Sequence, residues 1–169
     1  HNLTKFPSYS WKERVKVKIS SDKGIDFKNN ERGNKIHDLM SYIYSYNDIN
    51  YGVKKALIKN IITKNEKSYF EKIINNLLRN KDIMNYYNPK YNSYNEIEIL
   101  NNNGDVFRLD RVVELENNSV AVIDYKTGED NTEKYKNQIV NYKELLSNIY
   151  NGKVYGFILY VDLNRVVKI

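Results

Sequence analysis

The chain has 169 residues, and 27 Lys and Arg against 21 Asp and Glu give it a net charge of +6. This length is typical of one domain, and an apolar share of 41% is enough to close a core, which excludes a disordered chain. Cysteine is absent, which excludes a disulfide framework, a thiolate zinc site and an iron–sulfur cluster and fits a reducing compartment. With neither a long apolar run nor a signal-peptide pattern, we expect a soluble, cytoplasmic protein without membrane contact.

The positive charge favours a polyanionic partner such as nucleic acid. Lys is abundant together with Asn, Ile and Tyr, a composition that an A/T-rich genome produces, so part of this charge reflects codon usage. Arginine is more informative because its planar guanidinium suits bidentate contacts, and three of the six arginines lie inside the motifs described below. The chain also begins with His1 rather than Met, so we expect a domain cut from a longer polypeptide.

The first half of the chain is expected to be mostly helical. Residues 12–19 alternate charged and β-branched side chains, which is typical of an amphipathic strand or an extended arm. Apolar residues recur every three or four positions over 31–46 and predict an amphipathic helix. Two further helices are expected at 53–63 and 69–78, and we interpret 50–90 as a helical insertion.

The second half of the chain has the alternation of a sheet, interrupted by one helical stretch. Strands are expected at residues 94–100, 105–115, 120–126, 154–161 and 165–169, and a helix at 133–150. The strand at 120–126 opens with four residues that are apolar on both faces, which is typical of the centre of a sheet. The helix that follows it is expected to form a right-handed crossover to a parallel strand at 154–161. The order predicts an α/β domain with one mixed sheet flanked by helices.

The sequence Asp124-Tyr125-Lys126 ends the most apolar strand. Residues two apart project to the same face, so the Asp124 carboxylate and the Lys126 ammonium are neighbours while Tyr125 points away. Alone, this pattern is more typical of a structural ion pair. Asp110, however, lies in mid-strand between apolar neighbours, where a carboxylate needs a cation, and the hairpin brings it beside Asp124. Two converging acids with one lysine favour a divalent metal with oxygen ligands, as phosphodiester hydrolysis requires.

These residues resemble a known family. The segment GDVFRLDRVVELENNSVAVIDYKTG at 104–128, followed by QIVNY at 138–142, is similar to the RecB-type branch of the PD-(D/E)XK nucleases. More narrowly, it resembles the nuclease domain at the C-terminal end of RecB- and AddA-type helicase–nucleases. The resemblance covers 31–46 and nearly everything from Asn95 onward. It implies a single restriction-endonuclease-like domain with an αβββαβ core, whose catalytic part is 94–169.

The resemblance implies a metal site built from several elements. The family's Gly-x-x-x-His helix motif is matched by Gly33 and His37, which makes His37 a metal ligand rather than an ordinary polar residue of a helix. Asp110, within RLDRV, and Asp124 match the two acids that hold the metal. In the family the backbone carbonyl of the residue after the second acid also reaches the metal, and here that residue is Tyr125.

Four further residues complete the implied catalytic site. Glu96 matches the glutamate that opens the first core strand, although a plain surface acid is an equal alternative. Lys126 is expected to orient the attacking water and to stabilise the charge of the phosphorane, rather than to act as a general base. Gln138 and Tyr142 match the family's Gln-x-x-x-Tyr motif, and a spacing of four puts both on one helix face near the DNA end.

The arginines near these motifs are candidates for contacts with DNA. Arg32, Arg108 and Arg111 are expected to bind phosphates or to pair with the acids of the site, and Gln138 with Tyr142 to position the substrate. The many tyrosines offer stacking surfaces for single strands, though most must fill the core or the surface.

Two departures from the family pattern matter for the expected chemistry. Leu109 stands where relatives often have Gly or Pro, which affects strand geometry but no ligand. The absence of cysteine excludes the iron–sulfur cluster of AddB-type relatives, so the implied cofactor is Mg²⁺ alone, with Mn²⁺ able to substitute.

The implied function is a metal-dependent DNA exonuclease domain of an ATP-dependent helicase–nuclease in double-strand-break repair and recombination. Its partners are then DNA single strands or duplex ends, the helicase domains of the same parent chain, which alone use ATP, and as a further candidate a second helicase–nuclease subunit. One alternative is a catalytically inactive, nuclease-like DNA-binding module, against which the intact acids, lysine and histidine argue. Another is a stand-alone repair or restriction nuclease, which the Gln-x-x-x-Tyr motif and the start of the chain disfavour.

Overall fold

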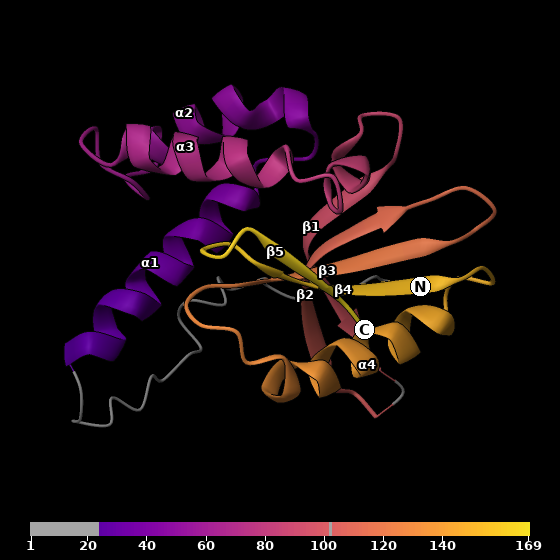
Figure 1. The fold of residues 1–169 in the computed structure, drawn as a ribbon. Coiled ribbons are helices and arrows are strands. Elements are labelled where there is room, and N and C mark those ends of the chain that lie inside the picture. The colour runs from indigo at the N-terminus through magenta and orange to yellow at the C-terminus, as the bar shows by residue number, and fades with distance from the viewer. Residues whose placement is uncertain (1–23, 102) are drawn as a thin grey trace, which may run out of the picture.

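The computed structural model describes residues 24–101 and 103–169, with side chains from residue 31 onward (Figure 1). The strand or arm expected at 12–19 lies outside the described residues. The elements are α1 (Gly24–Met40), η2 (Tyr46–Asp48), α2 (Ile49–Ile58), α3 (Lys67–Leu78), η3 (Met84–Tyr87), β1 (Ser93–Leu100), β2 (Val106–Glu114), β3 (Val120–Lys126), α4 (Thr132–Ser147), β4 (Val154–Tyr160) and β5 (Arg165–Lys168). No helix of the described part is long and apolar enough to cross a membrane.

The strands form one mixed sheet in the order β1-β2-β3-β4-β5. β3 and β4 are parallel, with α4 between them in the chain, and every other neighbouring pair is antiparallel. The predicted α/β class, mixed sheet and parallel crossover strands are therefore confirmed. β3 lies at the centre of the sheet, as its continuous apolar run predicts.

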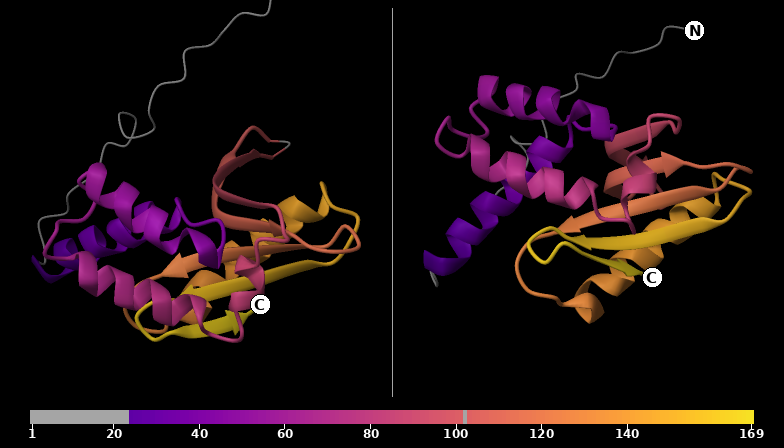
Figure 2. Two further views of the ribbon diagram at one scale, coloured as in Figure 1. Left: turned by 90° about the horizontal axis from the view of Figure 1, so that it is seen from above. Right: turned by 45° about the horizontal axis from the view of Figure 1, so that its top comes forward.

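Helices cover both faces of the sheet (Figures 1 and 2). One core cluster joins α1, α2 and α3 to one face, and a second joins α4 to the other. Consecutive residues of β3 alternate between the two clusters, so Ala121 and Ile123 pack toward α1 while Val120 and Val122 pack toward α4. Both faces of β3 are therefore buried, and polar side chains find room only where this strand ends.

Helix α1 ends at Met40, six residues before the predicted end at residue 46. Ile43 is fully buried although it follows the helix, so its apolar spacing reflects the core and not a continued helix. The carbonyl groups after the helix bind side chains from the sheet: Asn95 Nδ2 donates to the oxygens of Met40 and Ile43, and Arg111 donates to Ile43 and Tyr44. These long-range hydrogen bonds end the helix because they satisfy its last acceptors.

The insertion contains two helices, as predicted, but α2 begins four residues and ends five residues before the predicted range of 53–63. Helix α3 matches the predicted 69–78 except that it begins two residues earlier. Glu66 precedes α3, and its carboxylate accepts hydrogen bonds from the Thr63 amide at 2.8 Å and from Lys35 Nζ at 2.8 Å. Because Lys35 belongs to α1, this carboxylate joins the insertion to the helix that carries His37. The same hydrogen bonds lower the pKa of Glu66 to about 2.

Candidate metal centre

The candidate site lies where β2 and β3 separate. Their antiparallel register ends at the pair Arg111–Ile123, although the β3–β4 register continues to the end of β3. The next pair along would be Asp110 and Asp124. Instead, the backbone amide of Tyr125 donates to Asp110 Oδ2 at 2.8 Å. The Asp110 carboxylate thus replaces a backbone acceptor of the β2–β3 ladder, so the two strands separate here and Asp110 lies between them. We call this point of separation the fork.

Glu96 lies opposite Asp110 on the other side of β2, at a break in the β1–β2 register. The pairs Asn95–Arg111 and Ile97–Leu109 flank it, but Glu96 itself is unpaired in the ladder. Its φ is +54°, and the other non-glycine residues with positive φ in the described part are all Asn, which tolerates this conformation. A glutamate held in the left-handed region within a strand is strained by about 1–3 kcal/mol, a feature that clusters at functional sites.

The third member of the site, His37, comes from α1. A Cβ atom on Gly33 would lie 3.0 Å from Thr127 Oγ1, so the missing side chain lets α1 pass close to the end of β3. One helical turn later, His37 Nδ1 lies 3.3 Å from Asp110 Oδ1, and its ring meets the Tyr125 ring edge-on at 5.8 Å. The Gly-x-x-x-His spacing therefore has a packing reason: the glycine sets the distance at which the histidine meets the sheet.

Donor atoms of His37, Glu96 and Asp110 all lie within 4.8 Å of one another. Burial lowers the pKa of His37, but the hydrogen bond to Asp110 and the charges of nearby acids outweigh it, so the net shift is upward. Burial and the charge of Asp110 raise the pKa of Glu96, against the opposing effect of Arg108, whose Nε lies 3.0 Å from Glu96 Oε2. One imidazole and two carboxylates at this spacing suit a divalent cation.

Asp124 is also near this group but faces α4. It is 1% exposed, and its Oδ2 has no hydrogen-bond partner in the described part of the protein. Lys126 Nζ lies 2.6 Å from that oxygen, an ion contact without hydrogen-bond geometry. Burial, and then the charge of Asp110, raise the pKa of Asp124 to about 6. A buried carboxylate oxygen that has no hydrogen bond and shares one ammonium, beside other acids, can accept a bound cation, so the donor set fits the implied Mg²⁺.

Lys126 is the first member of a hydrogen-bonded chain on the α4 side. Its ammonium donates to Gln138 Oε1 at 3.2 Å, Gln138 Nε2 donates to the Tyr142 hydroxyl at 2.7 Å, and that hydroxyl donates to the Arg108 carbonyl at 2.9 Å. As the spacing predicts, Gln138 and Tyr142 share a helix face near Lys126. The ammonium also lies 4.6 Å from the centre of the Tyr135 ring. Sequence reasoning missed Tyr135, although its position three residues before Gln138 puts it on the same face.

The arginines expected to bind DNA have different surroundings. Arg32 forms a bidentate pair with Asp162 and donates to the Tyr69 hydroxyl, while Asp162 also accepts the Gly128 amide. Asp162 thus ties α1 to the loops after β3 and β4, a role with no local sequence signal. Arg108 pairs with Glu96 beside the candidate metal ligands.

The expectation for Arg111 needs correction. Its side chain is fully buried, its guanidinium lies 3.9 Å from the centre of the Tyr87 ring, and it donates to Asn95 Oδ1 and to the carbonyls of Ile43 and Tyr44. These contacts leave no free surface for a phosphate. Arg111 holds the end of α1 against the sheet and does not contact the acids of the site.

Tyr125 is predicted to supply a backbone carbonyl to the metal and to point its side chain away from Asp124. The side chain is indeed buried on the α1 side, with its hydroxyl 2.5 Å from that of Tyr87. The ligand role of its carbonyl stays a prediction.

Compared with known proteins, the chain matches no protein-family model, and a search of curated sequences finds no relative.

Proposed function

We propose that this chain is a metal-dependent nuclease domain of the restriction-endonuclease-like, PD-(D/E)XK type, which hydrolyses phosphodiester bonds in DNA. One observation carries the proposal: the fork between β2 and β3 brings a histidine, three acids and a lysine from four elements to one place. A structural ion pair would need only one acid and one lysine. Three acids close together, two of them buried, favour a further cation. A divalent metal with a lysine beside it suits the hydrolysis of a phosphodiester.

His37, Glu96 and Asp110 would hold the metal, with the Asp124 carboxylate and the Tyr125 carbonyl as the remaining candidates. Mg²⁺ or Mn²⁺ fits this set of one imidazole and several oxygens, none of them a thiolate. When bound, the metal supplies an activated water and shields the charge of the phosphate. Glu96 extends the ligand set that the sequence motif assigns, because its strained backbone turns it toward His37 and Asp110.

Lys126 is placed to stabilise the charge that develops on the phosphate. Asp124 lies on one side of its ammonium, Gln138 accepts one of its hydrogen bonds, and the Tyr135 ring lies beside it. A cation fixed before the reaction stabilises the transition state without a cost of reorganisation. In this proposal Gln138 and Tyr142 act mainly through Lys126, since the Tyr142 hydroxyl is used internally and the residue is 6% exposed.

The cellular setting is proposed from the sequence resemblance. It suggests an exonuclease domain within a cytoplasmic, ATP-dependent helicase–nuclease of DNA repair and recombination, with the helicase domains and a second subunit as partners. The net charge of +6 favours binding to DNA by contacts with phosphates, of which Arg32 and Arg108 are the nearest arginine candidates.

The test is hydrolysis of a labelled oligonucleotide, single-stranded and duplex, by the purified chain. Mg²⁺ and Mn²⁺ should support cleavage, whereas EDTA or Ca²⁺ should not. Asp124→Ala and Lys126→Ala should each lower the rate by about a thousandfold or more, since one removes an acid of the metal site and the other a transition-state charge. Lys67→Ala, an exposed lysine on α3, is the matched control and should keep the wild-type rate.

Cleavage at full rate in excess EDTA, or by Lys126→Ala, would contradict the assigned chemistry. DNA binding without cleavage under every metal condition would favour the inactive binding module.

A further inference from the structure

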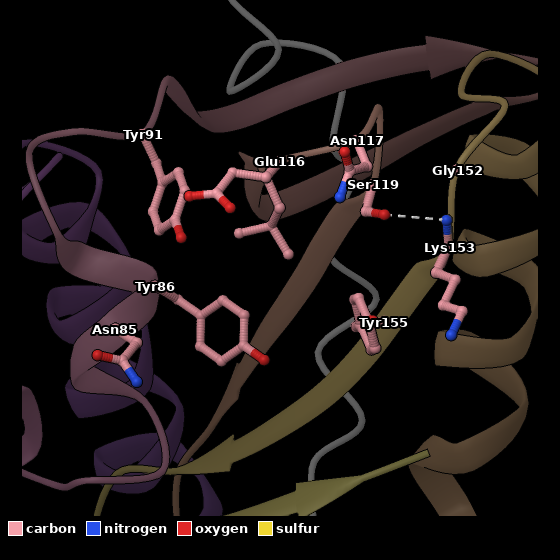
Figure 3. A pocket seen from close by; sticks show the side chains of 10 residues that line it. Asn85, Tyr86, Tyr91, Glu116, Asn117, Ser119, Gly152, Lys153 and Tyr155 are labelled. Carbon is pink, nitrogen blue, oxygen red and sulfur yellow. Dashed lines mark hydrogen bonds between the residues drawn. The ribbon is translucent and has the colours of Figure 1, made fainter.

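A pocket of about 560 Å³ lies at the end of the sheet away from the fork (Figure 3). Its floor and rim come from the turn between β2 and β3, including Leu115 and Ser119, and from Lys153 just before β4. None of the metal-site residues lines it. Along β3, Ser119 and Asp124 are separated by roughly 16 Å at the usual rise of a strand. The pocket is therefore distinct from the candidate metal centre.

Three tyrosines from separate segments form its walls. Tyr86 belongs to η3, Tyr91 precedes β1 and Tyr155 belongs to β4, and their rings face the same space in Figure 3. Their hydroxyls lie close enough together that the charges of Tyr155 and Tyr91, after burial, raise the pKa of Tyr86. The hydroxyls of Tyr86 and Tyr155 form no hydrogen bond within the described part of the protein. Flat apolar walls with free hydroxyls suit a flat ligand that has hydrogen-bonding edges.

The charges around the pocket are mostly positive. Lys90 Nζ lies 4.5 Å from the centre of the Tyr91 ring, Lys168 Nζ lies 5.3 Å from that of Tyr155, and Lys153 lies on the rim. The acid of the lining, Glu116, is paired with Lys90 at 3.1 Å. The ligand is therefore expected to carry negative charge outside the pocket as well as a flat ring inside it.

We propose that this pocket binds one unstacked nucleobase of a single-stranded nucleic acid, with the flanking phosphates against Lys153 and Lys168. Base–tyrosine stacking and lysine–phosphate contacts together are the usual means of holding single strands without sequence readout. Tyr155 and Tyr86 pack against the same core cluster as α1, so the pocket lies on the same face of the sheet as α1, the helix that carries His37. We expect the bound strand to be DNA rather than RNA, an expectation that rests on the proposed function.

Equilibrium binding of a fluorescein-labelled oligothymidylate, measured by anisotropy in EDTA to prevent cleavage, tests this proposal. Tyr155→Ala should weaken binding about tenfold, while Tyr155→Phe, which keeps the ring, should stay within about threefold of wild type. The matched control is Tyr51→Ala: Tyr51 is an exposed tyrosine on α2 that also has a lysine, Lys55, over its ring at 5.5 Å. It should bind as the wild type does.

Two further measurements make the result decisive. An abasic oligonucleotide of equal length should bind wild type and Tyr155→Ala equally, because it has no base to stack, and an oligouridylate should show whether DNA is preferred to RNA. If Tyr155→Ala fails to fold, Lys153→Glu on the exposed rim should still weaken oligothymidylate binding. Wild-type affinity in both Tyr155→Ala and Lys153→Glu would overturn the proposal. A failure of the nuclease assignment would appear as absent Mg²⁺-dependent cleavage and not in this binding assay in EDTA, so the two outcomes are distinct.

Discussion

The two sides of the fork are built on opposite principles. On the α4 side, Lys126, Gln138 and Tyr142 form a chain of hydrogen bonds that ends on a backbone carbonyl. On the α1 side, Glu96 and His37 converge on Asp110, and burial raises the pKa of Glu96. The comparison indicates that the Lys126–Gln138–Tyr142 chain is prearranged by the fold alone, whereas the acids Glu96, Asp110 and Asp124 carry negative charge that a bound cation would neutralise.

The α4 side and the α1 side of the fork also differ in backbone conformation. The α4 residues lie in a regular helix that packs closely on β4: a Cβ atom on Gly156 would come within 2.4 Å of Ile139 Cγ2. Glu96, by contrast, is strained at a break in the β1–β2 register. The fold therefore places its backbone strain at Glu96, next to the acids that a bound metal would neutralise.

Gln138→Ala tests whether the chain on the α4 side positions Lys126. Without its acceptor the ammonium can move, so we expect kcat to fall about tenfold to a hundredfold while the affinity for Mn²⁺ is unchanged. Asn137→Ala, its exposed neighbour on α4, is the control and should cleave normally. If Gln138→Ala instead loses metal affinity at a normal kcat, the two sides of the fork are not separate as proposed.

Asp124→Asn should stabilise the metal-free protein while abolishing cleavage. The pKa of Asp124 is about 6, above its ordinary 3.8, so the folded state binds this proton more tightly than the unfolded state does. The resulting destabilisation grows as the pH rises from about 3.8 to 6 and is fully present above 6. In EDTA at pH 8 we expect the free energy of unfolding to increase by about 2 kcal/mol, measured by urea denaturation. A decrease would show that the Lys126 contact outweighs the burial of the carboxylate.

Glu66, a carboxylate with hydrogen-bond partners, should affect stability in the opposite direction from Asp124 as the pH changes. Its pKa of about 2 lies below its ordinary 4.5, so its stabilising effect is present above pH 4.5 and is lost as the pH falls toward 2. Glu66→Gln should cost about 0.5–1 kcal/mol at pH 7, because the contacts are partly exposed to solvent, and should remove that part of the acid sensitivity. The free energy of unfolding of both proteins is measured by urea denaturation between pH 3 and pH 7. If it falls equally steeply with decreasing pH in wild type and in Glu66→Gln, Glu66 does not contribute to the acid sensitivity.

Tyr135 should have the smallest effect. Its ring lies beside the Lys126 ammonium, an interaction worth about 0.5–1 kcal/mol, so Tyr135→Leu should lower kcat roughly threefold to fivefold. Tyr135→Phe keeps the ring and should restore the rate. If Tyr135→Leu and wild type cleave at equal rates in single-turnover reactions, Tyr135 has no role in catalysis.

Local periodicity predicts the sheet well, because residues that alternate or repeat along an element show its type directly. The bounds of β3 are as predicted, those of β1, β4 and β5 differ by one residue at one end, and those of β2 by one residue at each end. The end of α1 is not predictable in this way. Asn95 and Arg111, more than fifty residues away, bind the carbonyl groups at which the helix stops, and Ile43 continues the apolar spacing only because it is buried.

The candidate site divides in the same manner. The neighbours Asp124 and Lys126 follow from a spacing of two on a strand, and Gln138 with Tyr142 from a spacing of four on a helix. The left-handed conformation of Glu96 and the pairing of Asp162 with Arg32 depend on packing between distant segments. Sequence spacing shows which side chains share an element's face, and only the folded chain shows which faces meet.

Calorimetric titration of Mn²⁺ into the DNA-free chain shows whether the fork between β2 and β3 binds a divalent metal. Wild type should bind Mn²⁺, and His37→Ala and Asp110→Asn should each weaken this binding at least tenfold. Glu66→Gln, away from the fork, should bind Mn²⁺ as the wild type does. Equal Mn²⁺ affinity in wild type, His37→Ala and Asp110→Asn would show that these residues do not form a metal site.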